Sequence, residues 1–197
     1  KHKITFKADG EIVDELTFGC GAQIPVIDGT KAPAKEGYVF LDWNTLPHIM
    51  PDSDITVNAL YLKKPESTLL DTVLTDEEKA DGIIVKSDIT VAEENANIQT
   101  ELINKYSKYT ASLIINIDIS KGKDENFTPI TETENLLTFT VDIPSEIQGK
   151  AEYIVLREHN GTVDALTTSK NADGEYIEVK DNTITIYAKK FSAYQLI

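Results

Sequence analysis

Cysteine is nearly absent from this sequence of 197 residues, in which Cys20 is the only thiol. A single cysteine excludes an internal disulfide and any metal site that needs two or more thiolates, such as a cysteine-rich zinc site. Cys20 stands between Gly19 and Gly21, so we expect a turn there, with a buried or half-buried thiol that does not act as a nucleophile. Low cysteine content suits the cytosol and also export from Gram-positive bacteria, so it leaves the compartment open.

Long apolar runs are also absent. No stretch approaches the ~20 residues that a membrane-spanning helix needs, and no secretory signal peptide is visible, so we expect no membrane insertion. The chain begins and ends in strand-like segments, residues 1–6 and 194–197, and both ends look cut. We therefore expect a piece of a longer protein, and the missing targeting signals carry little weight.

Basic residues are few. The chain has 19 lysines and arginines against 33 aspartates and glutamates, which gives a formal net charge of −14. Such a surface repels nucleic-acid phosphates and anionic lipid headgroups, so we expect no nucleic-acid partner. Calcium capture needs oxygen ligands at defined spacing, and no stretch has the EF-hand pattern. The densest acidic cluster, residues 76–78, predicts the first turn of a helix, and the overall acidity indicates solubility.

Catalytic signatures are missing as well. The histidines are His2, His48 and His159, and we expect all three to be exposed loop residues without a catalytic role. The chain has no H-x-x-x-H or H-E-x-x-H pair for zinc, no G-x-S-x-G elbow, and no glycine pattern that cradles phosphates. Carboxylate pairs are too common in so acidic a chain to nominate a glycosidase. The sequence thus predicts no enzyme, no catalytic or metal-binding residue and no cofactor, and it leaves any ligand-binding residues unknown.

Short strands fill the first 62 residues. Hydrophobic residues make up 41% of the chain, which is enough to build packed cores. Apolar and polar side chains alternate in residues 4–8, and Asp9-Gly10 then indicates a hairpin turn. Residues 63–67 are polar and include a proline, so we expect a linker to a second domain. Further strands of the first module are expected at residues 12–18, 37–43 and 55–61.

The remainder, residues 68–197, predicts a β-sandwich-like or barrel-like domain with one amphipathic helix. That helix is expected near residues 92–106, where Ile98, Leu102 and Tyr106 recur at spacing four. Strands are expected at residues 83–91, 113–119, 136–143, 153–158, 162–166, 175–179 and 183–187, with hairpins at residues 159–161 and 180–182. The fold class that follows is mainly β with minor α.

Nearly all of residues 1–62 carries a recognisable series of motifs. In chain order they are residues 4–10, Phe18-Gly19, Ile24-Pro25, residues 33–43 (PAKEGYVFLDW) and residues 50–61 (MPDSDITVNALY). The series resembles the small bacterial surface repeat of the Listeria–Bacteroides type, also called the internalin B-repeat. This resemblance implies a β-grasp-like fold, an exported protein, and a role as a spacer or in partner binding. The sequence departs from the pattern at Cys20, where a polar residue is usual, and at Asp42, where glycine is common.

Shorter motifs run through residues 68–197. They are residues 116–120 (NIDIS), 139–144 (FTVDIP), 153–161 (YIVLREHNG) and 191–194 (FSAY). They resemble the C-terminal β-domain of Firmicutes cell-surface proteins, in which the last motif is typically F-S-T-Y and precedes a linker and a wall anchor. The resemblance brings no activity with it. No sortase motif is visible, so the mode of anchoring stays open.

The aromatic residues could form a sugar-binding surface or belong to the core. Trp43, the only tryptophan, could stack on a sugar face, but its position at the end of a strand predicts a core anchor of the first module. Other residues that could line a ligand groove, but for which we expect core and rim positions, are Tyr106, Tyr109, Tyr153 and Tyr187.

The sequence contains motifs for two kinds of modification. The glycosylation sequons at residues 126–128 and 160–162 are interpreted as turn chemistry. Surface domains of Gram-positive bacteria can carry an isopeptide crosslink promoted by a buried acid, and Glu158 could supply that acid. Because Glu158 directly precedes a hairpin turn, we expect it to be exposed. An intact mass lower than the sequence mass by one ammonia or one water would reveal a crosslink.

The sequence as a whole predicts a non-catalytic module pair of an extracellular bacterial surface protein, either secreted or held at the cell wall. It would act as a spacer or stalk, or as an adhesive unit that binds a glycan or protein of the host or the cell wall. We expect a monomer. The alternative is a carbohydrate-binding accessory module of a secreted polysaccharide-acting enzyme, which predicts exposed aromatic side chains in a row. Both interpretations depend on fold resemblance.

Overall fold

The computed structural model describes residues 1–27, 29–44 and 46–197, which form two β-sheets with few helices. Strands make up 49% and helices 14% of the chain, which confirms the predicted mainly-β class with minor α. The strands are β1 (His2–Ala8), β2 (Glu11–Phe18), β3 (Tyr38–Asn44), β4 (Ile55–Lys63), β5 (Ile84–Ala92), β6 (Ile114–Lys123), β7 (Asn126–Ile130), β8 (Glu132–Asp142), β9 (Val155–His159), β10 (Thr162–Leu166), β11 (Tyr176–Lys180), β12 (Thr183–Lys190) and β13 (Ala193–Leu196). The α-helices are α1 (Ser67–Leu70), α2 (Asp76–Ala80) and α3 (Ala96–Lys105), and the 3₁₀ turns are η1 (Gly29–Lys31), η2 (Asp71–Val73) and η3 (Ser145–Ile147).

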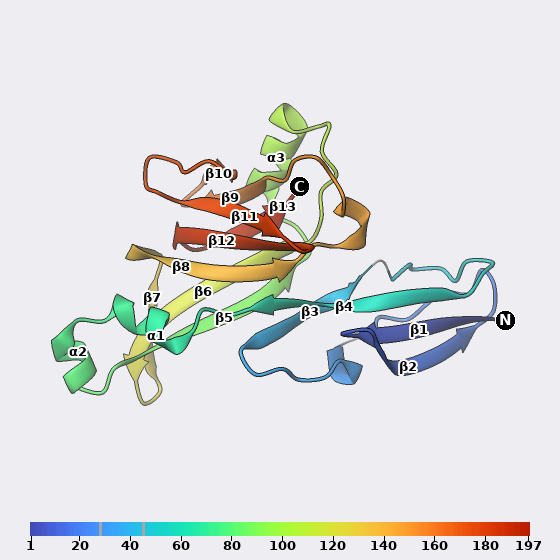
Figure 1. The fold of residues 1–197 in the computed structure, drawn as a ribbon, viewed down its shortest axis with the longest axis horizontal. Coiled ribbons are helices and arrows are strands. Elements are labelled where there is room, and N and C mark those ends of the chain that lie inside the picture. Colours follow the sequence, from blue (N-terminus) through green and yellow to red (C-terminus); the bar gives the residue numbers. More distant parts are fainter. Residues whose placement is uncertain (28, 45) are drawn as a thin grey trace.

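Strands β1 to β4 form one end of the larger sheet, on the right in Figure 1, in the order β2-β1-β4-β3. β1 and β4 lie parallel at its centre, with Ile4 opposite Ile55, and β2 and β3 flank them in antiparallel orientation. The alternation of apolar side chains puts Ile4, Phe6 and Trp43 on the face that packs into a core of the first module.

Strand β4 is shared between the two halves of the molecule. Its first residues pair with β1, and its last two, Leu62 and Lys63, pair with Val141 and Thr140 of β8. Through this pairing the sheet continues into β8, β12 and β11 of the second half. The linker predicted at residues 63–67 is therefore shorter than expected, because Lys63 still belongs to β4 and α1 follows soon after. The halves are joined by a hydrogen-bonded sheet as well as by the chain.

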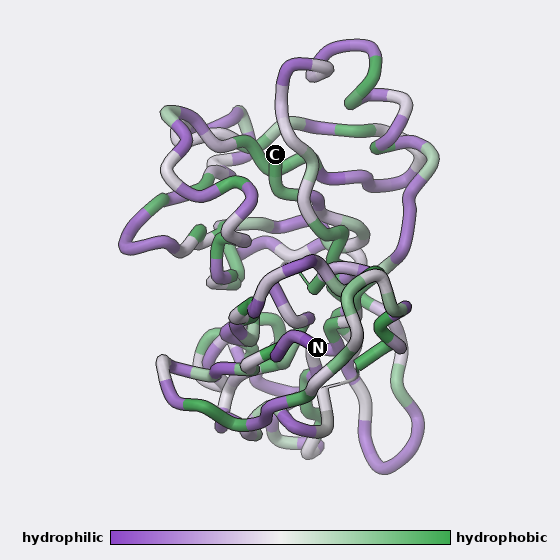
Figure 2. Tube along the Cα trace, turned by 90° about the vertical axis from the view of Figure 1, so that its right-hand side faces the viewer, coloured by the Kyte–Doolittle hydropathy of each residue, from purple (hydrophilic) through white to green (hydrophobic). Residues whose placement is uncertain are grey.

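The second half is a sandwich of two sheet layers. One layer is the β8, β12 and β11 part of the larger sheet, and the other is the six-stranded sheet β10-β9-β13-β6-β5, with β7 also paired to β6. Both layers contribute to one hydrophobic core, Phe139 and Ile184 from the first and Ile117 and Tyr194 from the second. In Figure 2 the outlying loops of the trace are mainly hydrophilic.

Helix α3 packs on the other face of the six-stranded sheet, against β9 and β10. The Asn95 side chain caps it by accepting a hydrogen bond from the backbone N–H of Ile98 at 3.0 Å, and Ile98 is fully buried. The helix predicted at residues 92–106 starts later than expected, because Ala92 still belongs to β5 and Asn95 is the cap. In the part of the chain that the structure describes, no helix has the length and apolar character needed to cross a membrane.

Three expected hairpins are confirmed, each with a two-residue turn at positive φ. The pairs Asp9-Gly10, Asn160-Gly161 and Asp181-Asn182 all have φ between 48° and 86°, as the type I′ turn requires. The β6–β7 hairpin was not predicted. It arises because β6 runs on to Lys123, beyond the β-branched stretch that marked the strand in the sequence, and turns back at Asp124.

Gly122 lies in β6 opposite Phe127 of β7. A Cβ at this position would overlap the carbonyl oxygen of Asn126, so the backbone would have to move. Gly122→Ala is expected to lower the free energy of unfolding by about 1–3 kcal/mol, measured by urea denaturation. Gly19→Ala is the matched control, because a Cβ on Gly19 meets nothing within 4 Å. Equal losses in the two variants would contradict the steric argument.

Asp142, the last residue of β8, ties the sandwich to the first half. Its carboxylate accepts a hydrogen bond from the backbone N–H of Tyr61 at 2.9 Å. Burial raises the pKa of Asp142, and this hydrogen bond and the nearby Lys35 offset the rise only in part. Because the folded pKa lies above the unfolded one, the protonated form contributes stability that is fully present below the ordinary pKa of 3.8. That contribution is lost as the pH rises through the folded pKa.

Asp142→Asn is therefore expected to raise the melting temperature at pH 7, because a neutral amide keeps an oxygen acceptor for Tyr61 without a buried charge. The gain should disappear at pH 3, where Asp142 is itself protonated. Circular dichroism melts at the two pH values check this, with Asp124→Asn in the exposed β6–β7 turn as the control. A gain that persists at pH 3 would show that the charge is not the cause.

Candidate functional site

The structure corrects several expectations for single residues. Cys20 lies in a turn as expected, but its thiol is exposed and not buried, because the turn closed by Gly21 at φ +76° holds it outside the core. His48 is an exposed loop residue, as predicted. His2 is not, since it lies in β1, is half-buried, and places Nε2 3.0 Å from a carboxylate oxygen of Asp52.

His159 was also expected to be exposed in a loop, and this is wrong. It is the last residue of β9, is 7% exposed, and follows Arg157 on the face that points into the sandwich. Its Nδ1 lies 3.3 Å from the carbonyl oxygen of Phe191, and its Nε2 lies 2.9 Å from a carboxylate oxygen of Glu132. The Asn160 side chain completes the set at 3.0 Å from Nε2. These contacts connect the end of β9 to the start of β8, so His159 stabilises the fold there.

Trp43 is a core anchor, as predicted. It is 1% exposed, and Phe6 meets it edge-on with ring centroids 4.9 Å apart. Phe40 packs against it at 5.3 Å, so three aromatic rings fill the centre of the first module.

The tyrosines named from the sequence are buried or half-buried, in line with core and rim positions. Tyr153 is 9% exposed, and Tyr106, Tyr109 and Tyr187 are half-buried. Among the aromatic side chains of the described residues, only Tyr38 is exposed, at 41%. The row of exposed aromatics that a carbohydrate-binding module predicts is therefore missing from this part of the chain.

The candidate modification sites occupy turns and strand ends. Asn126 opens β7 and Asn160 lies in the β9–β10 turn, and both are exposed. Glu158 was expected to be exposed but is half-buried, because its carboxylate accepts hydrogen bonds from the Gly161 N–H at 2.7 Å and the Ser192 hydroxyl at 3.0 Å. None of the lysines described by the structure pairs with Glu158.

A buried charged pair that the sequence analysis did not single out joins the two layers of the sandwich. Arg157 of β9 and Glu175, just before β11, are both 0% exposed, and Arg157 Nη1 lies 2.5 Å from Glu175 Oε1. A second guanidinium nitrogen donates to Asp164 at 2.9 Å. Charged side chains are buried this deeply only when they are paired. The pair thus links a strand of one sheet to the segment that enters the other.

Glu175 also fixes the loop that crosses from β10 to β11. Its carboxylate accepts hydrogen bonds from the backbone N–H of Lys189 at 2.7 Å and from the Asn171 amide at 3.1 Å. Burial alone raises the pKa of Glu175, but the hydrogen bonds from Arg157, Lys189 and Asn171 outweigh it and lower the pKa to about 2. Burial likewise lowers the pKa of Arg157, yet its two carboxylate partners raise it above the ordinary value. Both side chains stay charged at neutral pH, so the pair is no acid–base couple.

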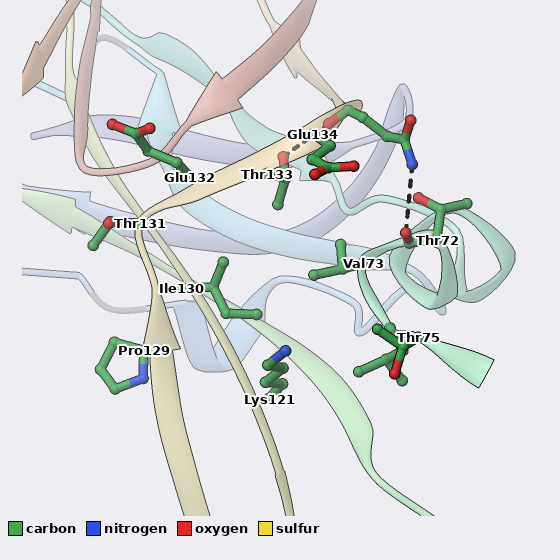
Figure 3. A pocket seen from close by; sticks show the side chains of 12 residues that line it. Thr72, Val73, Thr75, Lys121, Pro129, Ile130, Thr131, Glu132, Thr133 and Glu134 are labelled. Carbon is green, nitrogen blue, oxygen red and sulfur yellow. Dashed lines mark hydrogen bonds between the residues drawn. The ribbon is translucent and has the colours of Figure 1, made fainter. Parts of the chain in front are cut away.

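A groove of about 630 Å³ opens between η2 and the start of β8 (Figure 3). One wall consists of residues 72–75 and the other of residues 129–135, and Lys121 of β6 rises between them. The Asn135 amide donates to the backbone oxygen of Thr72 at 3.4 Å and so connects the two walls. The volume is in the range of sites that hold a small ligand or a short peptide segment, roughly 300–1,000 Å³.

This groove is rich in acceptors and poor in positive charge. Glu132 and Glu134 lie at its rim, and Lys121 is the only cationic residue among the described residues that line it. Lys121 Nζ lies 2.5 Å from a carboxylate oxygen of Glu78, which neutralises its charge. The hydrogen bond from Lys121 and that from the Thr75 N–H lower the pKa of Glu78. The remaining charge of the groove is negative.

The groove is lined by aliphatic side chains and by hydroxyl groups that already form hydrogen bonds. Val73 and Ile130 point toward one another across it in Figure 3 and form an apolar strip. The Thr72 hydroxyl donates to Leu69 O at 2.7 Å and the Thr133 hydroxyl to Asn135 O at 2.8 Å, so neither is poised as a nucleophile. Within the described ranges, no three histidine, cysteine, aspartate or glutamate side chains come together to hold a metal ion.

Sequence reasoning could not find this groove, because its walls come from segments about 60 residues apart and its polar residues belong to no motif. The polar run at residues 131–135 precedes the strand expected at residues 136–143, and the structure places residues 132–135 in β8. In comparisons with known proteins, no protein-family model, no curated protein and no solved structure matches the chain.

Proposed function

We propose that this chain is a non-catalytic module pair of an extracellular bacterial surface protein, secreted or held at the cell wall, that acts as a stiff spacer and carries an adhesive surface. The resemblance of residues 1–62 to a bacterial surface repeat supports the location. The single observation that supports a stiff spacer is the shared strand β4, which pairs with β1 in one half and with β8 in the other.

The two halves share side-chain packing as well as backbone pairing. Leu41 and Leu60 of the first half belong to the same hydrophobic cluster as Ile89 of β5 and the sandwich core. Domains joined by a flexible linker rotate independently, whereas a continuous sheet with a common core resists bending. The pair is therefore suited to hold a binding surface at a fixed distance and orientation.

Three edge strands, β2, β3 and β5, carry features that hinder pairing with other chains. β2 has an extra residue, Val13, opposite β1, and β3 has one, Leu41, opposite β4. Such bulges twist an edge away from a partner strand. On the edge of β5, the Lys64 ammonium donates to the carbonyl oxygen of Ser87 at 3.4 Å. These devices favour a monomeric spacer that recognises partners through side chains and not by strand addition.

The carbohydrate-binding alternative has less support from the geometry. The one exposed aromatic of the described residues, Tyr38, has the Lys35 ammonium 5.5 Å from its ring centroid. A sugar platform needs a free ring face, and no second exposed ring extends this one. We therefore do not advance this alternative as a second function.

Stiffness can be tested with spin labels, using the exposed Cys20 in the first half and a cysteine introduced by Asp124→Cys in the second. Pulsed electron paramagnetic resonance should give one narrow distance distribution. A variant with a short glycine-serine insertion after Lys64 is the control and should give a broad one. A broad distribution in the protein without the insertion would overturn the spacer mechanism.

The location is tested separately with antibodies raised against the module pair. Intact cells of the source organism should bind the antibody without permeabilisation, and external protease should remove the signal. A signal that appears only after permeabilisation would exclude a surface protein.

A further inference from the structure

Two glutamates that line the groove between η2 and β8, Glu132 and Glu134, have carboxylate oxygens without a hydrogen-bond donor among the described residues. Glu134 is exposed and forms no ion pair with any residue that the structure describes. Glu132 engages His159 through one carboxylate oxygen, and its other oxygen has no hydrogen-bond partner among the described residues. Glu134 and the second carboxylate oxygen of Glu132 can therefore receive hydrogen bonds from a guest.

The electrostatic potential around the groove is also negative, which favours a guest that carries positive charge. Helix α2 begins directly after the lining residue Thr75 and exposes Asp76 and Glu77, while the only lining cation, Lys121, is paired with Glu78. The negative potential attracts a cationic guest and repels an anionic one. Sulfated or sialylated glycans and nucleic acids are therefore disfavoured.

Among cationic guests, the apolar strip formed by Val73 and Ile130 favours those with an aliphatic part. Val73 and Ile130 add aliphatic surface to the groove that Glu132 and Glu134 also line (Figure 3). Lysine and arginine combine an aliphatic stem with a charged tip, so the stem can lie on the strip while the tip reaches a carboxylate. A sugar would prefer an aromatic ring, and no aromatic residue lines the groove among the described residues.

We propose that this groove binds an extended, basic segment of a partner protein, with an arginine or lysine side chain placed between Val73 and Ile130 and hydrogen-bonded to Glu134. The inference deepens the adhesive part of the proposed function and rests on it. The partner segment would carry basic side chains that alternate with apolar ones.

The test uses the whole chain and a fluorescein-labelled synthetic peptide of alternating arginine and valine, titrated at low salt and followed by fluorescence anisotropy. Saturable binding should weaken as salt is added. Glu134→Lys should weaken it roughly tenfold or more, because a charge-assisted hydrogen bond is replaced by repulsion. Glu11→Lys on β2 is the matched control, since it makes the same change in net charge at an exposed position in the other half, and it should leave the affinity nearly unchanged.

Three results would overturn the inference. The peptide of alternating arginine and valine could fail to bind, or Glu134→Lys and Glu11→Lys could weaken it equally, which would show a non-specific charge effect. An oligomer of glucosamine could also bind more tightly than the peptide and be lost in Glu134→Lys, which would assign the groove to amino sugars. None of these results would broaden the spin-label distances or abolish surface labelling, so failure here is distinct from failure of the spacer function.

Discussion

Glu175→Gln is expected to lower the free energy of unfolding at pH 7 by about 3 kcal/mol, because it leaves the guanidinium of Arg157 buried without its closest counter-ion. The pKa of Glu175 is lowered from an ordinary 4.5 to about 2. A carboxyl with a lowered folded pKa contributes stability above its unfolded pKa and loses it as the pH falls through the folded one. The difference in the free energy of unfolding between the parent protein and the variant should therefore be constant above about pH 4.5 and shrink toward pH 2. Urea denaturation across this pH range measures it.

The control for Glu175→Gln is Glu125→Gln, which makes the same chemical change in an exposed turn and should leave the unfolding curve unchanged. The double variant Arg157→Met with Glu175→Leu removes both charges and should recover part or all of the loss, because well-packed apolar residues avoid the desolvation of the ions. A Glu175→Gln loss that is independent of pH would show that shape, and not charge, holds the crossing loop.

The strands, turns and helix that are specified by local sequence patterns could be predicted. The β-branched alternation of residues 113–119 predicts a strand that is buried on its inner face, and β6 contains residues 114–119 of it. Asn160-Gly161 predicts a type I′ hairpin because both positions need positive φ, and it forms one. The spacing of Ile98 and Leu102 predicts the helix that is observed. In each case the information lies within one element.

Features that depend on long-range pairing were not predictable. Lys63 and Thr140 look like ordinary polar residues, and only their register across β4 and β8 shows that the two halves share a sheet. His159 precedes a turn signal and so read as exposed, but the two-residue turn keeps it in the strand, facing inward. Arg157 and Glu175 are 18 residues apart, and no motif contains both, so nothing in the sequence pairs them. A burial pattern of this kind is a property of the assembled sandwich.

Leu62→Ala is expected to lower the free energy of unfolding by about 2–5 kcal/mol. Leu62 is 0% exposed and lies at the end of β4, opposite Val141 of β8, in the core shared by the two sheet layers. Truncating it leaves a cavity where the two halves meet. Ile103→Ala on α3 is the matched control, because Ile103 is 70% exposed and its truncation creates no cavity.

The same variant decides whether the halves fold as one unit. Trp43 is the only tryptophan and lies in the core of the first half, so its fluorescence reports on that half, while far-ultraviolet circular dichroism reports on both. Because β4 belongs to both sheet regions, the two signals should coincide in the parent protein and shift together to lower urea in Leu62→Ala. A circular dichroism transition that moves while the Trp43 transition stays in place would mean that the first module folds independently. In that case the sheet pairing at Leu62 and Lys63 would orient the halves without coupling their stability.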